Sequence, residues 1–303
     1  MNGIHFLLTY QCTLECDHCF LYCSPRSEGT FSLSQIKSVL QEAKKMGVEW
    51  IYYEGGEPFL YYPLLKEAVS TASRMGFKVG IVTNSYFAHS EEDAVLWLKP
   101  LVVAGLDDLN VSNDEFHFGD QEQTTADILA AAARILGLEP IEICIEAPAA
   151  SLTAAEGGKG EPVVGGSTRF QGRAADLLTE GLPRRPWEEF NTCPYEELVT
   201  PERVHVDSFG NVHICQGISA GNMWEKPLAE LMESYRAEEH PICGPLVRNG
   251  PAGLARELGI QPEPEYVDAC HLCYSIRRRV LDTYPGVLEP RQVYGTDNRQ
   301  QKA

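Results

Sequence analysis

The amino-acid sequence predicts an α/β fold in which a parallel β-sheet precedes a small, cysteine-rich α+β region. In the first half, short apolar strand patterns alternate with amphipathic helical patterns of about 10–15 residues, as in right-handed βαβ units with parallel strands. Past residue 186 this alternation stops, and the chain carries a hairpin pattern and five of its cysteines. We therefore expect one large α/β unit with a smaller appendage.

Five segments of the first half have the pattern of buried strands. Each is a short run rich in apolar and β-branched residues, bounded by glycine or polar residues. They are residues 4–9, 49–53, 77–83, 109–112 and 141–146, and we place a sixth strand near residues 163–170.

The helices between these strands are marked by their caps. Ser32 and Gln35 form the sequence pattern of a capping box, and Gly47 follows the last turn of the same helix. Ser90 caps a later helix, which we expect to stop before Pro100 because proline lacks the backbone N–H. The expected helices cover residues 32–46, 63–75, 90–99 and 125–136.

The second half is less regular. Residues 147–172 are rich in Ala, Gly and Ser without a clear period, which predicts a long loop. Residues 203–207 and 212–215, joined by the turn residues 208–211, predict a β-hairpin, and a helix is expected from about 227 to 235. This region has few apolar stretches, and a small unit with a thin core is commonly held together by metal.

The composition excludes several classes of partner. The formal net charge is −18, from 25 basic and 43 acidic residues, so the chain repels phosphate backbones and anionic lipid. We expect neither nucleic acid nor membrane as a partner; the charge favours solubility or attracts a cationic substrate. No apolar run is long enough for a bilayer, and the start lacks the features of a signal peptide, which predicts a cytoplasmic protein.

Ten cysteines are clustered along the chain rather than spread evenly. In a chain without an export signal, clustered cysteines indicate metal ligands before disulfides. Cys12, Cys16 and Cys19 follow the first strand within one loop, and three such thiolates can bind three irons of a cubane cluster. The fourth iron then stays open to the amino and carboxylate groups of S-adenosylmethionine (SAM). On spacing alone, zinc with Cys23 as a fourth ligand and a ferredoxin-type cluster remain alternatives.

The Cys12–Cys19 loop, with an aromatic residue after its last cysteine, resembles the signature of the radical SAM superfamily. The turn Gly55-Gly56-Glu57-Pro58 is similar to that family's GGEP motif, one βα unit later. The resemblance covers about residues 1–175 and implies a partial (β/α)6 TIM-like barrel, which we assign to residues 1–185. It implies a [4Fe–4S] cluster, SAM, and cofactor contacts from Gly55, Gly56, Glu57, Pro58, Thr83, Asn84, Ser112, Asp114 and Arg173. For the polar residues that close strands, helix capping is the alternative role.

The later cysteines form a second set. A hairpin cysteine and a CxxC pair, with one thiol upstream, could enclose one cluster with no open position. This set resembles the SPASM/twitch extension of radical SAM enzymes, which we assign to residues 186–303 and which implies an auxiliary [4Fe–4S] cluster. Its expected ligands are Cys193, Cys215, Cys270 and Cys273, with zinc as the alternative metal; Cys243 is not assigned.

Two residues are candidates for further, catalytic chemistry. Cys144 lies in an alternating strand pattern and could point into the barrel as a hydrogen-atom donor, although such a cysteine is more often a small core residue. Glu146 ends the same strand and is placed for contact with substrate or SAM. His117 is a weaker candidate for a base.

The sequence thus predicts a radical SAM enzyme that oxidises or crosslinks a peptide or a small molecule. Such an enzyme also needs a low-potential electron donor such as flavodoxin or ferredoxin. The competing hypothesis is a non-catalytic protein, either an iron–sulfur electron carrier or a zinc-stabilised binding protein.

Overall fold

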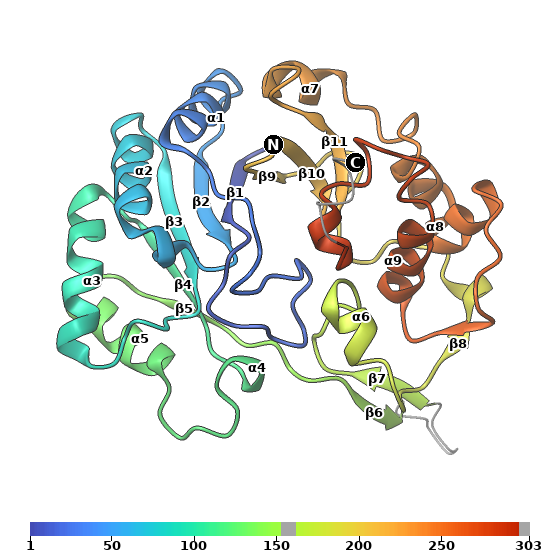
Figure 1. Cartoon of the computed structure of the whole chain (residues 1–303), viewed down its shortest axis with the longest axis horizontal. Helices are drawn as coiled ribbons and strands as arrows, with labels where there is room; N and C mark the ends of the chain where they lie inside the picture. Colours follow the sequence, from blue (N-terminus) through green and yellow to red (C-terminus); the bar gives the residue numbers. More distant parts are fainter. Residues whose placement is uncertain (153–161, 297–303) are drawn as a thin grey trace.

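The computed structural model describes residues 1–152 and 162–296 and is built on one open, curved sheet (Figure 1). The strand order is β11-β10-β9-β1-β2-β3-β4-β5, and every pair from β9 to β5 is parallel. The predicted α/β class with a parallel sheet is therefore confirmed. The strands of this sheet are β1 (Gly3–Thr9), β2 (Trp50–Gly55), β3 (Lys78–Thr83), β4 (Asp108–Ser112), β5 (Ile141–Ile143), β9 (Arg203–Asp207), β10 (Asn211–Cys215) and β11 (Ile218–Asn222).

Four helices follow the first four strands in turn and cover one side of the sheet (Figure 1). They are α1 (Leu33–Lys45), α2 (Tyr62–Arg74), α3 (Glu91–Ala104) and α5 (Thr125–Ile135), with the short α4 (Glu115–Phe118) between β4 and α5. The capping box of Ser32 and Gln35 forms as predicted, and Ile36, Val39 and Leu40 of α1 are fully buried. Each helix packs apolar residues on the sheet, while α3 also exposes Leu96 and Val103 and α5 exposes Ile135.

Helix α3 does not stop before Pro100, so that expectation is wrong. The helix continues through Pro100 to Ala104, where Gly105 ends it in a left-handed conformation. Proline removes one hydrogen bond to the carbonyl of Leu96, but Leu96 is 71% exposed, so water can reach that carbonyl. Leu98 and Leu101 on either side are fully buried and stabilise the continued helix.

The sixth strand of the parallel sheet is β9 and not the segment near residues 163–170. Within that segment, β7 (Pro162–Gly165) pairs antiparallel with β6 (Ala149–Leu152) in a separate two-stranded sheet. The expected loop over 147–172 therefore contains a hairpin, and its residues 153–161 lie outside the described residues. Strand β5 is also shorter than expected and ends at Ile143.

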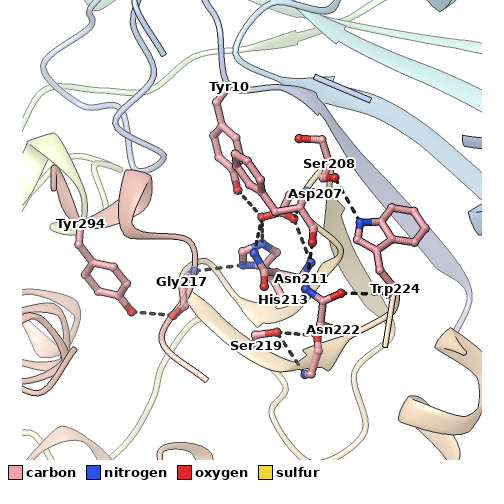
Figure 2. Close-up of polar contacts among 12 residues, drawn as sticks. Tyr10, Asp207, Ser208, Asn211, His213, Gly217, Ser219, Asn222, Trp224 and Tyr294 are labelled. Carbon is pink, nitrogen blue, oxygen red and sulfur yellow. Dashed lines mark hydrogen bonds and ion pairs between the residues drawn. The ribbon is translucent and has the colours of Figure 1, made fainter. Parts of the chain in front are cut away.

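The predicted hairpin of β9 and β10 is confirmed, and β11 extends it. Its turn is fixed by Asp207, whose carboxylate is fully buried (Figure 2). Asp207 Oδ2 accepts hydrogen bonds from Tyr10 Oη at 3.1 Å and from Asn211 Nδ2 at 2.9 Å, and lies 3.2 Å from His213 Nε2. Because β9 pairs with β1 and Tyr10 follows β1, this network joins the hairpin to the start of the chain.

The remaining residues build a helical layer beyond the hairpin. The helix expected near 227–235 is present as α7. The CxxC pair lies at the start of α9, and α8 bends at Asn249–Gly250. These elements are α6 (Arg173–Leu177), α7 (Leu228–Ser234), α8 (Cys243–Glu257), α9 (Ala269–Arg279), the strand pair β8 (Arg185–Pro186) and β12 (Glu265–Tyr266), and the 3-10 turns η2 (Trp187–Glu189) and η3 (Arg291–Tyr294). A further 3-10 turn, η1 (Pro58–Tyr61), lies between β2 and α2. In the described parts of the chain, no helix is both long and apolar enough to cross a bilayer.

Candidate functional site

The carboxyl ends of β1 to β4 open onto a cavity of about 380 Å³. Parallel α/β sheets bind ligands at this edge, because the loops after neighbouring strands meet there. Among the residues expected to hold metal or cofactor, those lining the cavity are Cys12, Cys16, Cys19, Gly55, Gly56, Thr83, Asn84 and Ser112. The sequence-predicted site residues of four strands are therefore brought to one cavity.

Arg173 holds the cysteine loop from behind and does not line the cavity. Its guanidinium donates hydrogen bonds to the carbonyl of Cys16 at 2.6 Å and to that of Cys23 at 2.7 Å. Its backbone N–H donates to the carbonyl of Cys19 at 3.0 Å, and its side chain stacks on Tyr22. These contacts fix three points of the loop, so the three thiols keep a defined arrangement.

The three loop thiols differ in acidity. Burial raises the pKa of Cys12 to about 11 and that of Cys16 to about 12. A hydrogen bond from the Cys23 thiol lowers the pKa of Cys19 to about 6, and the Cys23 backbone N–H also donates to Cys19 Sγ at 3.3 Å. At neutral pH Cys19 is therefore a thiolate, whereas the other two thiols lose their protons when a metal binds.

The turn after β2 packs directly on the chain that leads into the cysteine loop. Gly56 donates its backbone N–H to the carbonyl of Thr9 at 2.7 Å. A Cβ atom at Gly56 would lie 2.1 Å from the carbonyl oxygen of Gln11, and Gly55 has a φ of +125°. Both positions therefore require glycine, the first for close approach and the second for its backbone conformation.

Glu57 supports the cavity wall from inside the protein. Its carboxylate is fully buried and accepts hydrogen bonds from the backbone N–H of Phe59 at 2.9 Å, from Thr83 Oγ1 at 2.9 Å and from the Asn84 N–H at 2.8 Å. Burial raises its pKa to about 7. Pro58 is also buried and opens η1. Neither residue lines the cavity, so both position the turn and the end of β3.

Asn84 and Ser112 bring polar atoms to the cavity, whereas Asp114 lies behind it. Asn84 Nδ2 lies 3.5 Å from Cys12 Sγ and donates to Thr13 Oγ1 at 3.0 Å. The Asp114 carboxylate caps α4 and lies 2.7 Å from His117 Nδ1. Burial opposes ionisation of Asp114, but the contact with His117 keeps its pKa below the usual value. Asp114 thus takes the helix-capping role that was the alternative.

Cys144 and Glu146 lie outside the cavity. Both side chains are exposed. The cavity is lined instead by Ile143, which precedes Cys144, and by Ile145, which lies between Cys144 and Glu146. The expectation that Cys144 points into the barrel is therefore wrong, because the alternation of the chain after β5 turns the two isoleucines inward instead. The backbone of Glu146 accepts a hydrogen bond from Thr168 Oγ1 at 2.9 Å and donates one to Ser167 Oγ at 2.8 Å.

Three residues that the sequence analysis missed line the same cavity at its deeper end. His5 on β1, Glu54 on β2 and His205 on β9 lie on neighbouring strands, and His5 pairs in register with His205. Their only signal in the sequence is a polar residue within an apolar strand, and this does not reveal which residues become neighbours. Two further lining residues, His18 and His117, stand near the cysteine loop.

The later cysteines surround a second, smaller cavity. Cys193, Cys215, Cys270 and Cys273 line it together with the buried Arg277, as expected of one four-thiol set. Burial raises the pKa of Cys215, Cys270 and Cys273, so these thiols are protonated until a metal displaces the protons. Arg169, Gln171 and Glu196 line both cavities, which places the two sites side by side. Cys243 is buried beside Tyr235 and does not line the second cavity.

Arg277 places a buried positive charge at the second cavity, which Arg169 also lines. Arg277 donates to the carbonyl of Gln216 at 2.8 Å and to Tyr294 Oη at 3.1 Å. Burial opposes its charge, but Tyr294 first, and then Cys273 and Cys215, keep the pKa of Arg277 above its usual value. A buried cation among thiols favours their deprotonated form, which is the form that binds metal.

Comparison with known proteins shows what the segment around the first site is similar to. Residues 6–117 match the sequence model of the radical SAM superfamily. The matched radical SAM segment runs from β1 into α4. It therefore contains the cysteine loop, the Gly55–Gly56 turn, and the ends of β3 and β4 that line the first cavity.

Two relatives match part of the chain. The antilisterial bacteriocin subtilosin biosynthesis protein AlbA of Bacillus subtilis is 32% identical over 113 residues, which are 37% of this chain and 25% of AlbA. The PqqA peptide cyclase of Streptomyces rochei is 34% identical over 86 residues, 27% of this chain and 22% of the cyclase. The chain thus spans about a quarter of the length of these relatives. The crystal structure of methylornithine synthase (PylB) aligns with a TM-score of 0.36 at 15% identity, over 47% of this chain and 44% of that chain.

Proposed function

We propose that this protein is a radical SAM enzyme that modifies a peptide or a small molecule. The observation that carries the proposal is the single cavity at the ends of β1 to β4. It combines the three loop thiols with a glycine turn and polar strand ends, all within the segment that matches the superfamily. A site that only transfers electrons or binds zinc has no need of the glycine turn and the polar strand ends.

Each part of the cavity has a role in this proposal. Cys12, Cys16 and Cys19 would hold a [4Fe–4S] cluster and leave one iron without a protein ligand. With SAM bound, the cluster supplies a 5′-deoxyadenosyl radical for hydrogen abstraction. Gly55 and Gly56 would let the backbone approach SAM closely, with Asn84 and Ser112 as polar contacts. Thr83 would line the cavity beside them, and Glu57, Pro58, Asp114 and Arg173 would position these groups from the surrounding layer.

We also propose an auxiliary [4Fe–4S] cluster at the second cavity, held by Cys193, Cys215, Cys270 and Cys273. The four thiols and the buried Arg277 suit an anionic cluster. In this proposal residues 1–185 form the radical SAM core and residues 186–303 the twitch/SPASM-like extension. Because the two cavities share lining residues, an electron could pass between a substrate radical and the second cluster over a short path.

The substrate class is an oxidisable or crosslinkable peptide or small molecule in the cytoplasm. The names of the two relatives, a bacteriocin biosynthesis protein and a peptide cyclase, favour a peptide. The net charge of −18 suits a basic one. A low-potential donor such as flavodoxin or ferredoxin would supply the electron for SAM cleavage.

Cleavage of SAM tests the proposal. Anaerobically reconstituted protein is incubated with dithionite and SAM, and 5′-deoxyadenosine is quantified by chromatography. We expect the wild-type protein to form 5′-deoxyadenosine. In Cys16→Ala its rate of formation should fall at least about 100-fold, because the cluster loses a ligand. Cys144→Ala removes an exposed cysteine outside both cavities and serves as the matched control. Wild-type formation no higher than that of Cys16→Ala would instead support a non-catalytic metal protein.

Iron content tests the second site. Reconstituted wild-type protein should contain about eight irons per chain and Cys270→Ala about four, since each cubane holds four. A wild-type value of about four, with zinc bound in addition, would replace the auxiliary cluster by a zinc site.

A further inference from the structure

His5, Glu54 and His205 form a cluster of metal-ligating side chains apart from both sets of cysteines. They lie on β1, β2 and β9, the three neighbouring strands at the centre of the sheet. His5 pairs in register with His205 and with Tyr52, and Glu54 is two residues beyond Tyr52 on the same side of β2. All three side chains line the cavity below the cysteine loop.

The distances within this cluster are those of ligands around one ion. Glu54 Oε2 lies 3.3 Å from His5 Nδ1, and Glu54 Oε1 lies 3.0 Å from His205 Nε2. One donor atom from each of the three residues lies within 4.8 Å of the other two. Neighbouring donors at about 2.0–2.1 Å from a metal ion are themselves about 3.0–3.4 Å apart, so the observed spacing fits.

The His5 side chain has a buried ring nitrogen that lacks a hydrogen-bond partner. Its Nδ1 atom is buried and makes no hydrogen bond, although the Glu54 carboxylate is near. Buried polar atoms in folded proteins rarely stay without a partner, and a metal ion would use this lone pair. Glu54 is already suited to bind a cation, since the two histidines keep its pKa well below the usual range although burial opposes this.

A second cluster of two histidines and one carboxylate differs in the hydrogen bonding of its carboxylate. His18, Asp114 and His117 also lie within 4.8 Å of one another. There the carboxylate of Asp114 is occupied by the backbone N–H groups of Phe116, His117 and Ile145. Within residues 1–152 and 162–296, the side-chain contacts of the Glu54 carboxylate are those with His5 and His205, so its oxygens are available for an ion.

We propose that His5, Glu54 and His205 bind a divalent transition-metal ion such as Zn²⁺ or Fe²⁺. Two histidines and one carboxylate are a known ligand set for such ions and leave further coordination positions open. Here the open positions face the cavity, so a carbonyl, carboxylate or imidazole of the substrate can complete the coordination. The ion would hold the substrate at the deep end of the cavity, opposite the cysteine loop. This site does not depend on SAM cleavage.

Zinc binding in the absence of SAM tests the site. Iron–sulfur-reconstituted protein is incubated with one equivalent of Zn²⁺ per chain and desalted, and the retained zinc is measured by mass spectrometry and by X-ray absorption. We expect about one zinc per chain with only nitrogen and oxygen ligands, at about 2.0–2.1 Å. Sulfur ligands at about 2.3 Å, or no retained zinc in protein with full iron content, would overturn the proposal.

Variants locate the bound zinc. His205→Ala and Glu54→Gln should each weaken zinc binding at least about tenfold, while iron and labile sulfide stay at the wild-type level. His89→Ala removes an exposed histidine far from the cavity lining and should bind zinc as the wild type does. Unchanged zinc affinity in both site variants would refute the assignment. If either variant fails to fold, the zinc ligands seen by X-ray absorption in the wild-type protein decide whether this site exists.

Discussion

Cys23 changes the acidity of its neighbour in the cysteine loop, although the sequence assigns it no ligand role. Its thiol and its backbone N–H both donate to Cys19 Sγ, and this keeps the pKa of Cys19 near 6. The loop therefore has one thiolate ready for iron at neutral pH, and two thiols whose pKa burial raises. The first iron can bind at Cys19 without displacing a proton.

Alkylation of the cluster-free protein checks this role. The reaction of Cys19 with iodoacetamide should rise with a midpoint near pH 6, because only the thiolate reacts. In Cys23→Ala the hydrogen bond is lost, the pKa of Cys19 rises, and the midpoint should move upward by about one unit or more. Peptide mapping by mass spectrometry reads each cysteine separately, and exposed Cys144 is the internal control. Equal midpoints in both proteins would contradict the role of Cys23.

At the scale of residues, sequence reasoning could group site residues that lie close together along the chain. Cys12, Cys16 and Cys19 lie within one loop, and the glycine turn follows one βα unit later. It could not find His5, Glu54 and His205, because pairing of distant strands makes them neighbours. Local spacing also could not distinguish residues that line the cavity from those that support it, such as Arg173.

At the scale of elements, the hairpin of β9 and β10 depends on one carboxylate. One oxygen of Asp207 accepts hydrogen bonds from the Tyr10 hydroxyl and the Asn211 side-chain amide and contacts the His213 ring. All three of these residues are buried (Figure 2). The second oxygen of Asp207 accepts the backbone N–H groups of Phe209 and Asn211 in the turn. Removal of this group leaves several buried donors without an acceptor.

We expect Asp207→Ala to lower the free energy of unfolding by about 3 kcal/mol or more. In a protein of this size, the melting temperature should fall by about 5 °C, as followed by circular dichroism under anaerobic conditions. Asp120→Ala, which changes an exposed carboxylate, should leave the melting temperature within about 1 °C of the wild type. An unaltered melting temperature in Asp207→Ala would show that the network does not stabilise the hairpin.

Element boundaries could be predicted where caps and periodicity agree, as in α1 and the hairpin. They could not be predicted where packing outweighs a local preference, as in α3, which continues through Pro100 because Leu98 and Leu101 are buried. Of the β6–β7 pair, only a strand near residues 163–170 was predicted. Strand β6 was missed because it is short and exposed and therefore carries no apolar alternation.

At the scale of the molecule, the sheet joins the two proposed functional regions. Strand β9, from the region after residue 186, pairs with β1 along its length, and β10 and β11 continue the same sheet. The sequence indicated a sheet and a separate cysteine-rich unit, but strand order cannot be read from local patterns. The two regions therefore differ in proposed function while sharing one sheet.

A shortened chain tests whether the first region folds by itself. A polypeptide of residues 1–185 lacks β9, so the edge of β1 and the buried Ile4 and Phe6 lose their cover. We expect it to be insoluble or to melt without cooperativity in circular dichroism. A chain ending at residue 296 keeps every described element and should melt like the full-length protein. Cooperative melting of the 1–185 polypeptide would show that β9 is dispensable for folding.

The pairing of Gly3 with Arg203 also sets an order of events during synthesis. Until β9 leaves the ribosome, β1 has a neighbour on one side only, and its open edge stands beside a loop rich in thiols. Open strand edges pair readily with other chains. The interval between translation of β1 and of β9 is therefore the period in which the nascent chain is most exposed to aggregation. Slower initiation, which leaves fewer nascent chains side by side, should raise the yield of soluble protein.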